Sequence, residues 1–142
     1  MADIDVMIVD DEAFVRKTLT QMLKLCGVHR ITEATNGRHA LSELVSLPEF
    51  QLPNLILCDL EMELMGGIEF LESLRSQENE SIATLPVIVS TAHTDVETVR
   101  AAAALDIDGY LVKPFNAAKL RARLQAVLGT LPNRSVVYSA MT

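Results

Sequence analysis

The sequence has little of what marks secreted or membrane-bound chains. Its two cysteines, Cys26 and Cys58, are too few for a disulfide framework, and we expect both to be small buried residues in a reducing compartment. No apolar run is long enough to span a membrane, and the N-terminus, with Asp3 and Asp5, lacks the basic region of a signal peptide. We therefore expect a cytoplasmic location and no membrane partner.

Positive charge is also scarce. The 12 Lys and Arg residues stand against 19 Asp and Glu residues, which gives a net charge of -7. Such a surface repels a phosphate backbone, so we expect no nucleic-acid partner, and it favours a divalent cation or a basic partner surface.

The length of 142 residues fits one domain with its own hydrophobic core. We assign residues 1–128 to this domain and residues 129–142, which lack a helical period, to a C-terminal tail or linker. Such a tail also allows the chain to be the front part of a longer protein.

Apolar periodicity predicts strands and helices in alternation. Short apolar runs are typical of strands buried on both faces, and they predict strands at 6–9, 55–58, 87–90 and 110–112, with a weaker strand at 30–33. Helices are predicted over 14–25, 37–47, 67–77, 94–105 and 116–128, and the polar stretch 77–84 is expected to be a surface loop. Five strands alternating with five helices indicate an α/β fold, in which helices cover both faces of a parallel sheet.

Polar residues follow four of these strands. Asp10 and Asp11 follow the first strand, Asp59 the third, Thr91 the fourth and Lys113 the fifth. In a parallel sheet these ends share one edge, which is where ligands bind in open α/β folds. An isolated Asp-Asp pair is more often a helix cap, but three converging carboxylates repel one another, which raises their pKa values unless a cation is present. Mg²⁺ suits a site that combines carboxylates with phosphate oxygens.

The residue types at this edge fit phosphoryl transfer. Asp59 is the candidate nucleophile, because an aspartate carboxylate can attack phosphorus and form an acyl phosphate. Lys113 offers a positive charge for phosphate oxygens, and Thr91 offers a hydroxyl donor. Each residue alone has a simpler explanation, as a solvated strand end or a surface lysine, but their joint occurrence at four strand ends is specific.

Over residues 4–128 the chain resembles the receiver domain of bacterial two-component response regulators. The matching segments are residues 10–12, 33–37, 58–62, 90–92 and 112–115. The resemblance implies a CheY-like, flavodoxin-like (βα)5 fold with strand order 2-1-3-4-5.

The resemblance also implies a role for each residue of the site. Asp59 would be the phosphoacceptor. Asp10, Asp11, Asp59 and the backbone carbonyl of Glu61 would hold Mg²⁺, and Lys113 would pair with the phosphoryl group. Such a chain is not an enzyme in the usual sense, because it catalyses only its own phosphorylation and dephosphorylation.

A switch at the fifth strand is a further implication of the resemblance. Thr91 would move to contact the phosphoryl group, and Tyr110 would then turn inward. The surface formed by residues 94–105, 110–112 and 116–128 would change its binding to a downstream protein target, through a population shift that could include a phosphorylation-dependent homodimer.

The phosphoryl donor implied by the resemblance is a histidine kinase or a histidine phosphotransfer protein. We expect it to dock on the first helix beside Asp11, with Phe14 and Val15 as candidate contacts, although Val15 also suits the core.

The chain departs from the family in the loop at 61–67. Glu63 stands where the family usually has proline, and Gly66 stands where it often has aspartate. We expect this loop to be more flexible, because proline restricts the backbone and glycine frees it. In the family, the residues matching Glu61 and His93 flank the path of the hydrolytic water.

Two alternatives stay open. A haloacid-dehalogenase-like phosphatase also uses a strand-end aspartate, a lysine and Mg²⁺, but it needs a second aspartate two positions after the nucleophile, where this chain has Glu61. The other alternative is a receiver-like interaction module that is never phosphorylated.

Overall fold

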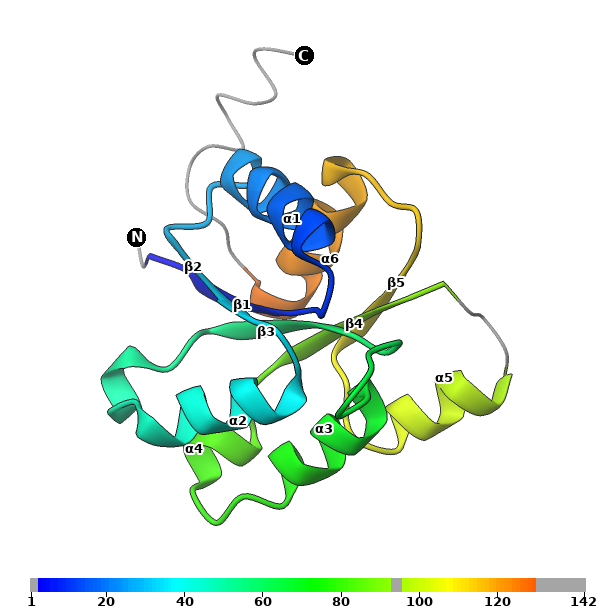
Figure 1. The fold of residues 1–142 in the computed structure, drawn as a ribbon. Helices are drawn as coiled ribbons and strands as arrows, with labels where there is room; N and C mark the ends of the chain where they lie inside the picture. The colour runs from blue at the N-terminus through cyan, green and yellow to red at the C-terminus, as the bar shows by residue number, and fades with distance from the viewer. Residues whose placement is uncertain (1–2, 93–95, 130–142) are drawn as a thin grey trace.

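A parallel sheet of five strands forms the centre of the protein (Figure 1). The computed structural model describes residues 3–92 and 96–129. The strands are β1 (Asp5–Val9), β2 (Arg30–Ala34), β3 (Leu55–Asp59), β4 (Val87–Thr91) and β5 (Gly109–Val112). They pair in the order β2-β1-β3-β4-β5, which confirms the predicted topology.

Helices cover both faces of the sheet (Figure 1). On one face lie α1 (Ala13–Leu25) and α6 (Ala117–Leu128). On the other lie α2 (Gly37–Ser46), α3 (Gly67–Arg75), α4 (Glu80–Ala83) and α5 (Val96–Ala103), and a 3-10 turn, η1 (Glu49–Gln51), precedes β3. Within the described ranges, no helix has both the length and the apolar character needed to cross a bilayer.

The alternation of side chains along the strands divides the core in two. In β1, Val6 and Ile8 pack with α1 and α6, whereas Met7 and Val9 pack with the helices of the opposite face. Both layers are formed by buried apolar side chains, which explains why the central strands are continuous apolar runs in the sequence.

Side chains at the helix ends fix several boundaries. The Asn36 side chain accepts a hydrogen bond of 2.8 Å from the His39 N–H at the start of α2, and the Asn116 side chain accepts one of 2.9 Å from the Lys119 N–H at the start of α6. Gly129 ends α6 in a left-handed conformation with φ of 74°.

The prediction of a loop over 77–84 is wrong, because this stretch contains α4. The Asn79 side chain caps the helix by accepting a hydrogen bond of 2.9 Å from the Ser81 N–H. Ile82 is buried in the core shared with α2 and α3. Ile82 is the only large apolar residue in this stretch and gives no helical period, so the sequence pattern could not predict this short helix.

Arg75, the last residue of α3, joins three segments of the chain. Its guanidinium donates hydrogen bonds of 2.8–3.0 Å to four backbone carbonyl oxygens, those of Ala83, Leu85, Leu105 and Asp106. Ala83 ends α4 and Leu85 lies just after it, whereas Leu105 and Asp106 follow α5. The carboxyl end of α5 is therefore fixed to α3 and α4.

Candidate functional site

The register of the strands brings the predicted polar residues to one edge of the sheet. The pairing of β1 with β3 places Asp10 beside Asp59, and the pairing of β3 with β4 places Thr91 one residue beyond the partner of Asp59. Lys113 directly follows β5, and its backbone N–H donates a hydrogen bond of 2.8 Å to the carbonyl oxygen of Thr91. Four separate segments of the chain thus meet around Asp59.

The Asp59 carboxylate is buried, with an exposed fraction of 2%. Its Oδ1 lies 3.1 Å from the Lys113 Nζ and accepts a hydrogen bond of 3.1 Å from the Glu61 N–H. Its Oδ2 is buried, and the described residues give it no hydrogen-bond partner. One oxygen of the carboxylate is therefore held in place, and the other is left for an additional ligand.

Burial governs the electrostatics of the site. It raises the pKa of Asp59 to about 6, against the opposing effect of Lys113, and it is also the largest cause of the raised pKa of Asp10. Burial alone would lower the pKa of Lys113, but the hydrogen bond and the charge of Asp59 outweigh it and raise that pKa. At Asp10 and Asp59 the pKa is raised as expected from the sequence, but the main cause is burial, and repulsion between the carboxylates contributes less.

An acidic cluster lies beside Asp59. Carboxylate oxygens of Asp10, Asp11 and Glu12 lie within 4.8 Å of one another. Asp10 is 1% exposed; its Oδ1 accepts a hydrogen bond of 2.9 Å from the Glu12 N–H, and its Oδ2 is buried without a partner among the described residues. Unpaired buried carboxylate oxygens are the ligands that a hard cation prefers, so the donor set fits Mg²⁺. The sequence motif contained Glu12, but our reasoning did not count it among the ligands.

The loop after β3 is tied to this cluster through its backbone. The Glu63 N–H donates a hydrogen bond of 3.0 Å to the Asp11 Oδ2, which a proline at this position could not do. At Gly67 a Cβ atom would lie 2.6 Å from the Leu60 Cα and 2.7 Å from the Asp59 carbonyl oxygen, so only glycine allows this close approach. The expected flexibility of the loop stays a prediction.

Arg16 is a residue of the site that the sequence reasoning missed. Its guanidinium donates a hydrogen bond of 2.8 Å to the carbonyl oxygen of Asp10 and one of 3.0 Å to the Glu33 carboxylate. It thereby joins the ends of β1 and β2. A charged residue on a helix next to the core was the available signal, because it needs partners of this kind.

The structure describes the other residues predicted to take part in function, except for His93. Tyr110 lies in β5, next to the strand that carries Thr91, and is 41% exposed. Phe14 is exposed on α1, whereas Val15 packs in part against the core. His93 lies outside the described residues, as do the beginning of the helix predicted over 94–105 and the tail beyond Gly129.

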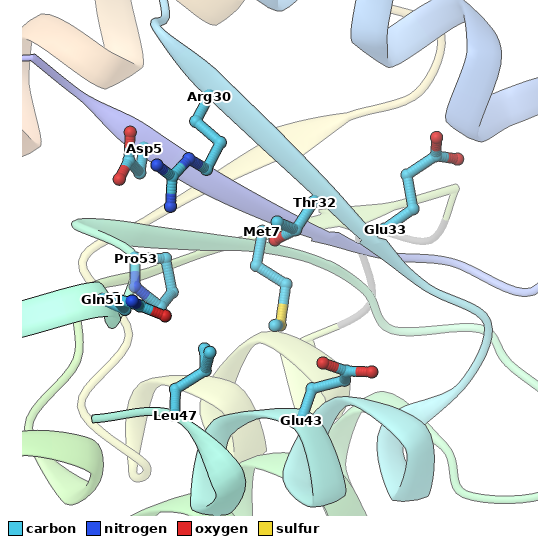
Figure 2. Close-up of a pocket in the computed structure, with 9 residues that line it drawn as sticks. All are labelled: Asp5, Met7, Arg30, Thr32, Glu33, Glu43, Leu47, Gln51 and Pro53. Carbon is cyan, nitrogen blue, oxygen red and sulfur yellow. The ribbon is translucent and has the colours of Figure 1, made fainter. Parts of the chain in front are cut away.

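The cavity in Figure 2 is separate from this site. It has a volume of about 160 Å³ and lies between the β1–β2 face of the sheet and α2 with η1. Arg30, Asp5 and Met7 line it from the strands, and Glu43 and Gln51 line it from the opposite side. No residue of the predicted site is among its lining residues.

Comparison with known proteins shows the family of the chain. The family of response regulator receiver domains matches residues 6–125. The chain is 34% identical over 128 residues to a "probable chemotaxis protein CheY" of Rhizobium etli, covering 90% of this chain and 95% of that protein. It is 30% identical over 141 residues to a "probable transcriptional regulator ycf27" of Porphyridium aerugineum, covering 93% of this chain but only 55% of that protein.

A solved structure agrees with this result. The chemotaxis protein CheY4 of Vibrio cholerae has a TM-score of 0.78 and 30% sequence identity to this chain, over 89% of this chain and 99% of that one. The chain therefore belongs to the family of response regulator receiver domains. This is a signalling family of two-component systems, which confirms the predicted CheY-like fold and favours it over the phosphatase alternative.

Asp59→Asn should change how the stability of the protein depends on pH. The pKa of Asp59 is about 6 in the folded protein and about 3.9 in an unfolded chain. The folded state therefore binds this proton more tightly, and stability is lost as the pH rises through this interval. With a chelator present, we expect the free energy of unfolding of the wild type to fall relative to that of the variant between about pH 4 and pH 7, by on the order of 1–3 kcal/mol. Urea unfolding at several pH values measures this difference, and a difference that does not vary with pH would contradict it.

Proposed function

We propose that this chain accepts a phosphoryl group on Asp59 from a histidine kinase or a histidine phosphotransfer protein, in a reaction that requires Mg²⁺. The main support is the Asp59 carboxylate, which has one oxygen held by Lys113 and one buried oxygen without a partner in the described residues. An Asp59 oxygen attacks phosphorus while the P–N bond of the phosphohistidine breaks, and the electron pair leaves with the imidazole nitrogen. Water later cleaves the acyl phosphate, which releases phosphate and restores the carboxylate.

The ligands that we propose for Mg²⁺ are Asp10, Asp11, Asp59 and the backbone carbonyl of Glu61. Glu12 is close enough to its neighbours to add an oxygen, directly or through water. When bound, the ion would offset the charge of the carboxylates and of the phosphoryl oxygens. An open hollow lined by Asp11 and Glu12 leaves this cluster accessible to solvent.

We assign two donors to the phosphoryl group. The Lys113 ammonium already contacts Asp59 at 3.1 Å, so a small displacement brings it to a phosphoryl oxygen. The Thr91 hydroxyl, at the buried end of β4, is the second donor. Because the backbone N–H of Lys113 is hydrogen-bonded to the carbonyl oxygen of Thr91, a movement of either residue affects both β4 and β5.

The output surface that we propose is formed by α5, β5 and α6. Thr91 ends β4, the strand beside β5, so its displacement acts at the edge of this surface. Tyr110 in β5 is 41% exposed, so part of its side chain is accessible to solvent in this structure. Phosphorylation thus shifts the equilibrium between two conformations of this surface. A downstream protein or a second copy of the chain would bind one conformation more tightly than the other.

The surface that we propose for the phosphoryl donor lies along α1. A largely apolar groove of about 220 Å³ runs between α1 and the segment after β5, with Phe14 at one side and Lys113 and Phe115 at the other. Phe14 is 79% exposed, and an exposed aromatic side chain beside an apolar groove is a typical anchor for a partner protein.

We also propose that residues 1–128 are the receiver domain and residues 129–142 a tail or linker. The end of α6 at Leu128 and the left-handed Gly129 support this boundary. The free, buried cysteines Cys26 and Cys58 suit the cytoplasmic location that we infer for a partner of histidine kinases.

The proposal predicts one acceptor of phosphate. Incubation with acetyl phosphate and Mg²⁺ should add a single phosphate to the protein, as detected by mass spectrometry, because an activated phosphodonor can replace the kinase. Asp59→Asn should abolish this addition, and Glu63→Gln, which removes an exposed carboxylate nearby, should retain it. A wild type that gains no phosphate would favour the unphosphorylated interaction module, and continuous turnover of a phosphomonoester would favour the phosphatase.

Thr91→Ala should separate phosphorylation from its effect on the output surface. We expect the variant to gain phosphate on Asp59, while the amide signals of α5, β5 and α6 in NMR spectra shift less than in the wild type, because the hydroxyl that links the two is lost. Thr91→Ser keeps the hydroxyl and should behave as the wild type does. Equal shifts in Thr91→Ala and the wild type would rule out this coupling.

Phe14→Asp should slow transfer from a phosphorylated histidine phosphotransfer protein that is active on the wild type, by roughly tenfold or more, as for the loss of a central aromatic contact. Transfer from acetyl phosphate should not change, because this small donor needs no docking surface. Phe50→Asp is the matched control: Phe50 is 84% exposed but lies in η1, away from α1. If Phe50→Asp slowed protein-mediated transfer as much as Phe14→Asp, the docking surface would be wrongly placed.

A further inference from the structure

The Glu61 side chain joins the loop after β3 to Ala92, the residue directly after β4. Its Oε1 accepts a hydrogen bond of 2.6 Å from the backbone N–H of Ala92, the residue directly after Thr91. Its Oε2 is buried, and no described residue offers it a hydrogen bond. A charge-assisted hydrogen bond of this length is among the stronger ones in proteins, so this contact restrains the backbone of Ala92.

The Glu61 carboxylate also belongs electrostatically to the site. The backbone N–H of Glu61 is bonded to the Asp59 carboxylate, and the negative charge of its side chain contributes to the raised pKa of Lys113. The carboxylate therefore acts on the same ammonium that pairs with Asp59. An additional anion on Asp59 would meet this negative charge at short range.

We propose that Glu61 is a positioning residue that holds Ala92, the residue directly after β4, in its resting position until a phosphoryl group on Asp59 displaces the Glu61 carboxylate from the Ala92 N–H. This inference rests on the proposed phosphorylation of Asp59. The phosphoryl group brings about two negative charges and three acceptor oxygens. Repulsion in this partly buried site disfavours the carboxylate beside it, and the new oxygens compete for the same donors.

The effect of this contact falls on Thr91. While Glu61 holds Ala92, Thr91 is fixed on both sides, by β4 before it and by the bonded Ala92 after it. Release of Ala92 removes one of these restraints. Glu61 therefore opposes the movement of Thr91 in the unphosphorylated protein and gives way once Asp59 carries phosphate.

A matched control lies two residues along the same loop. The Glu63 side chain is exposed, and the contact of this residue with Asp11 is made by its backbone N–H. Glu63→Gln thus removes one negative charge from the loop and leaves both the Ala92 contact and the Asp11 contact in place. Comparison of the two positions separates the hydrogen bond to Ala92 from the net charge near the site.

The experiment compares the wild type with Glu61→Ala, Glu61→Gln and Glu63→Gln. The initial rate of phosphorylation by acetyl phosphate is measured at saturating Mg²⁺, and hydrogen exchange at the Ala92 amide is measured in the unphosphorylated proteins. We expect Glu61→Ala to be phosphorylated roughly three- to tenfold faster and its Ala92 amide to exchange faster by a similar factor, as for the loss of one charge-assisted hydrogen bond. Glu61→Gln keeps the shape of the side chain and an acceptor oxygen, so its phosphorylation and exchange rates should lie between those of the wild type and Glu61→Ala. Glu63→Gln should match the wild type in the exchange rate at Ala92.

The outcomes distinguish this inference from the proposed function. A wild type that gains no phosphate overturns the proposed function and this inference with it. A wild type that is phosphorylated while Glu61→Ala shows an unchanged or lower rate, or unchanged exchange at Ala92, overturns this inference alone. The same holds if Glu63→Gln accelerates phosphorylation as much as Glu61→Ala does, because the cause would then be net charge.

Discussion

The burial of negative charge at one edge of the sheet is the constraint on which the site depends. Asp10 and Asp59 lie at the ends of two neighbouring central strands, where water is largely excluded. Lys113 supplies an opposite charge, yet the pKa of Asp59 stays raised, so one ammonium does not offset the cost of burial. The folded chain thus keeps an excess of negative charge in a buried position, where a cation would interact with it most favourably.

Most of the fold could be predicted from the sequence, because strands buried on both faces are continuous apolar runs and parallel strands share their carboxyl edge. The convergence of Asp59 and Lys113 follows from these two facts. The helix around Ile82 could not be predicted, since one large apolar residue gives no helical period. The contacts of Arg16 and Glu61 depend on the paths of loops and on side-chain conformations, which no periodicity records.

The loop after β3 is held by three hydrogen bonds. The glutamate that stands in place of the usual proline provides an N–H for Asp11, and the side chain of Glu61 provides an acceptor for Ala92. The backbone of Glu61 adds a third bond, to Asp59. The loop is thus tied to Asp11 through Glu63, the residue that departs from the family pattern, and to Asp59 through Glu61.

The hydrogen bonds of Arg75 limit the motion that α5 can make. Two of them, to the carbonyl oxygens of Leu105 and Asp106, fix the chain just after its last turn. The first residue of α5, Val96, is exposed. A helix held at one end rotates about that end instead of sliding. The eight residues of α5 place Val96 roughly 11 Å from this pivot, so that a tilt of about 10° displaces it by about 2 Å. The displacement in any such tilt would therefore grow from Ala103 toward Val96, and a contact made near Val96 would change far more than one made near Ala103.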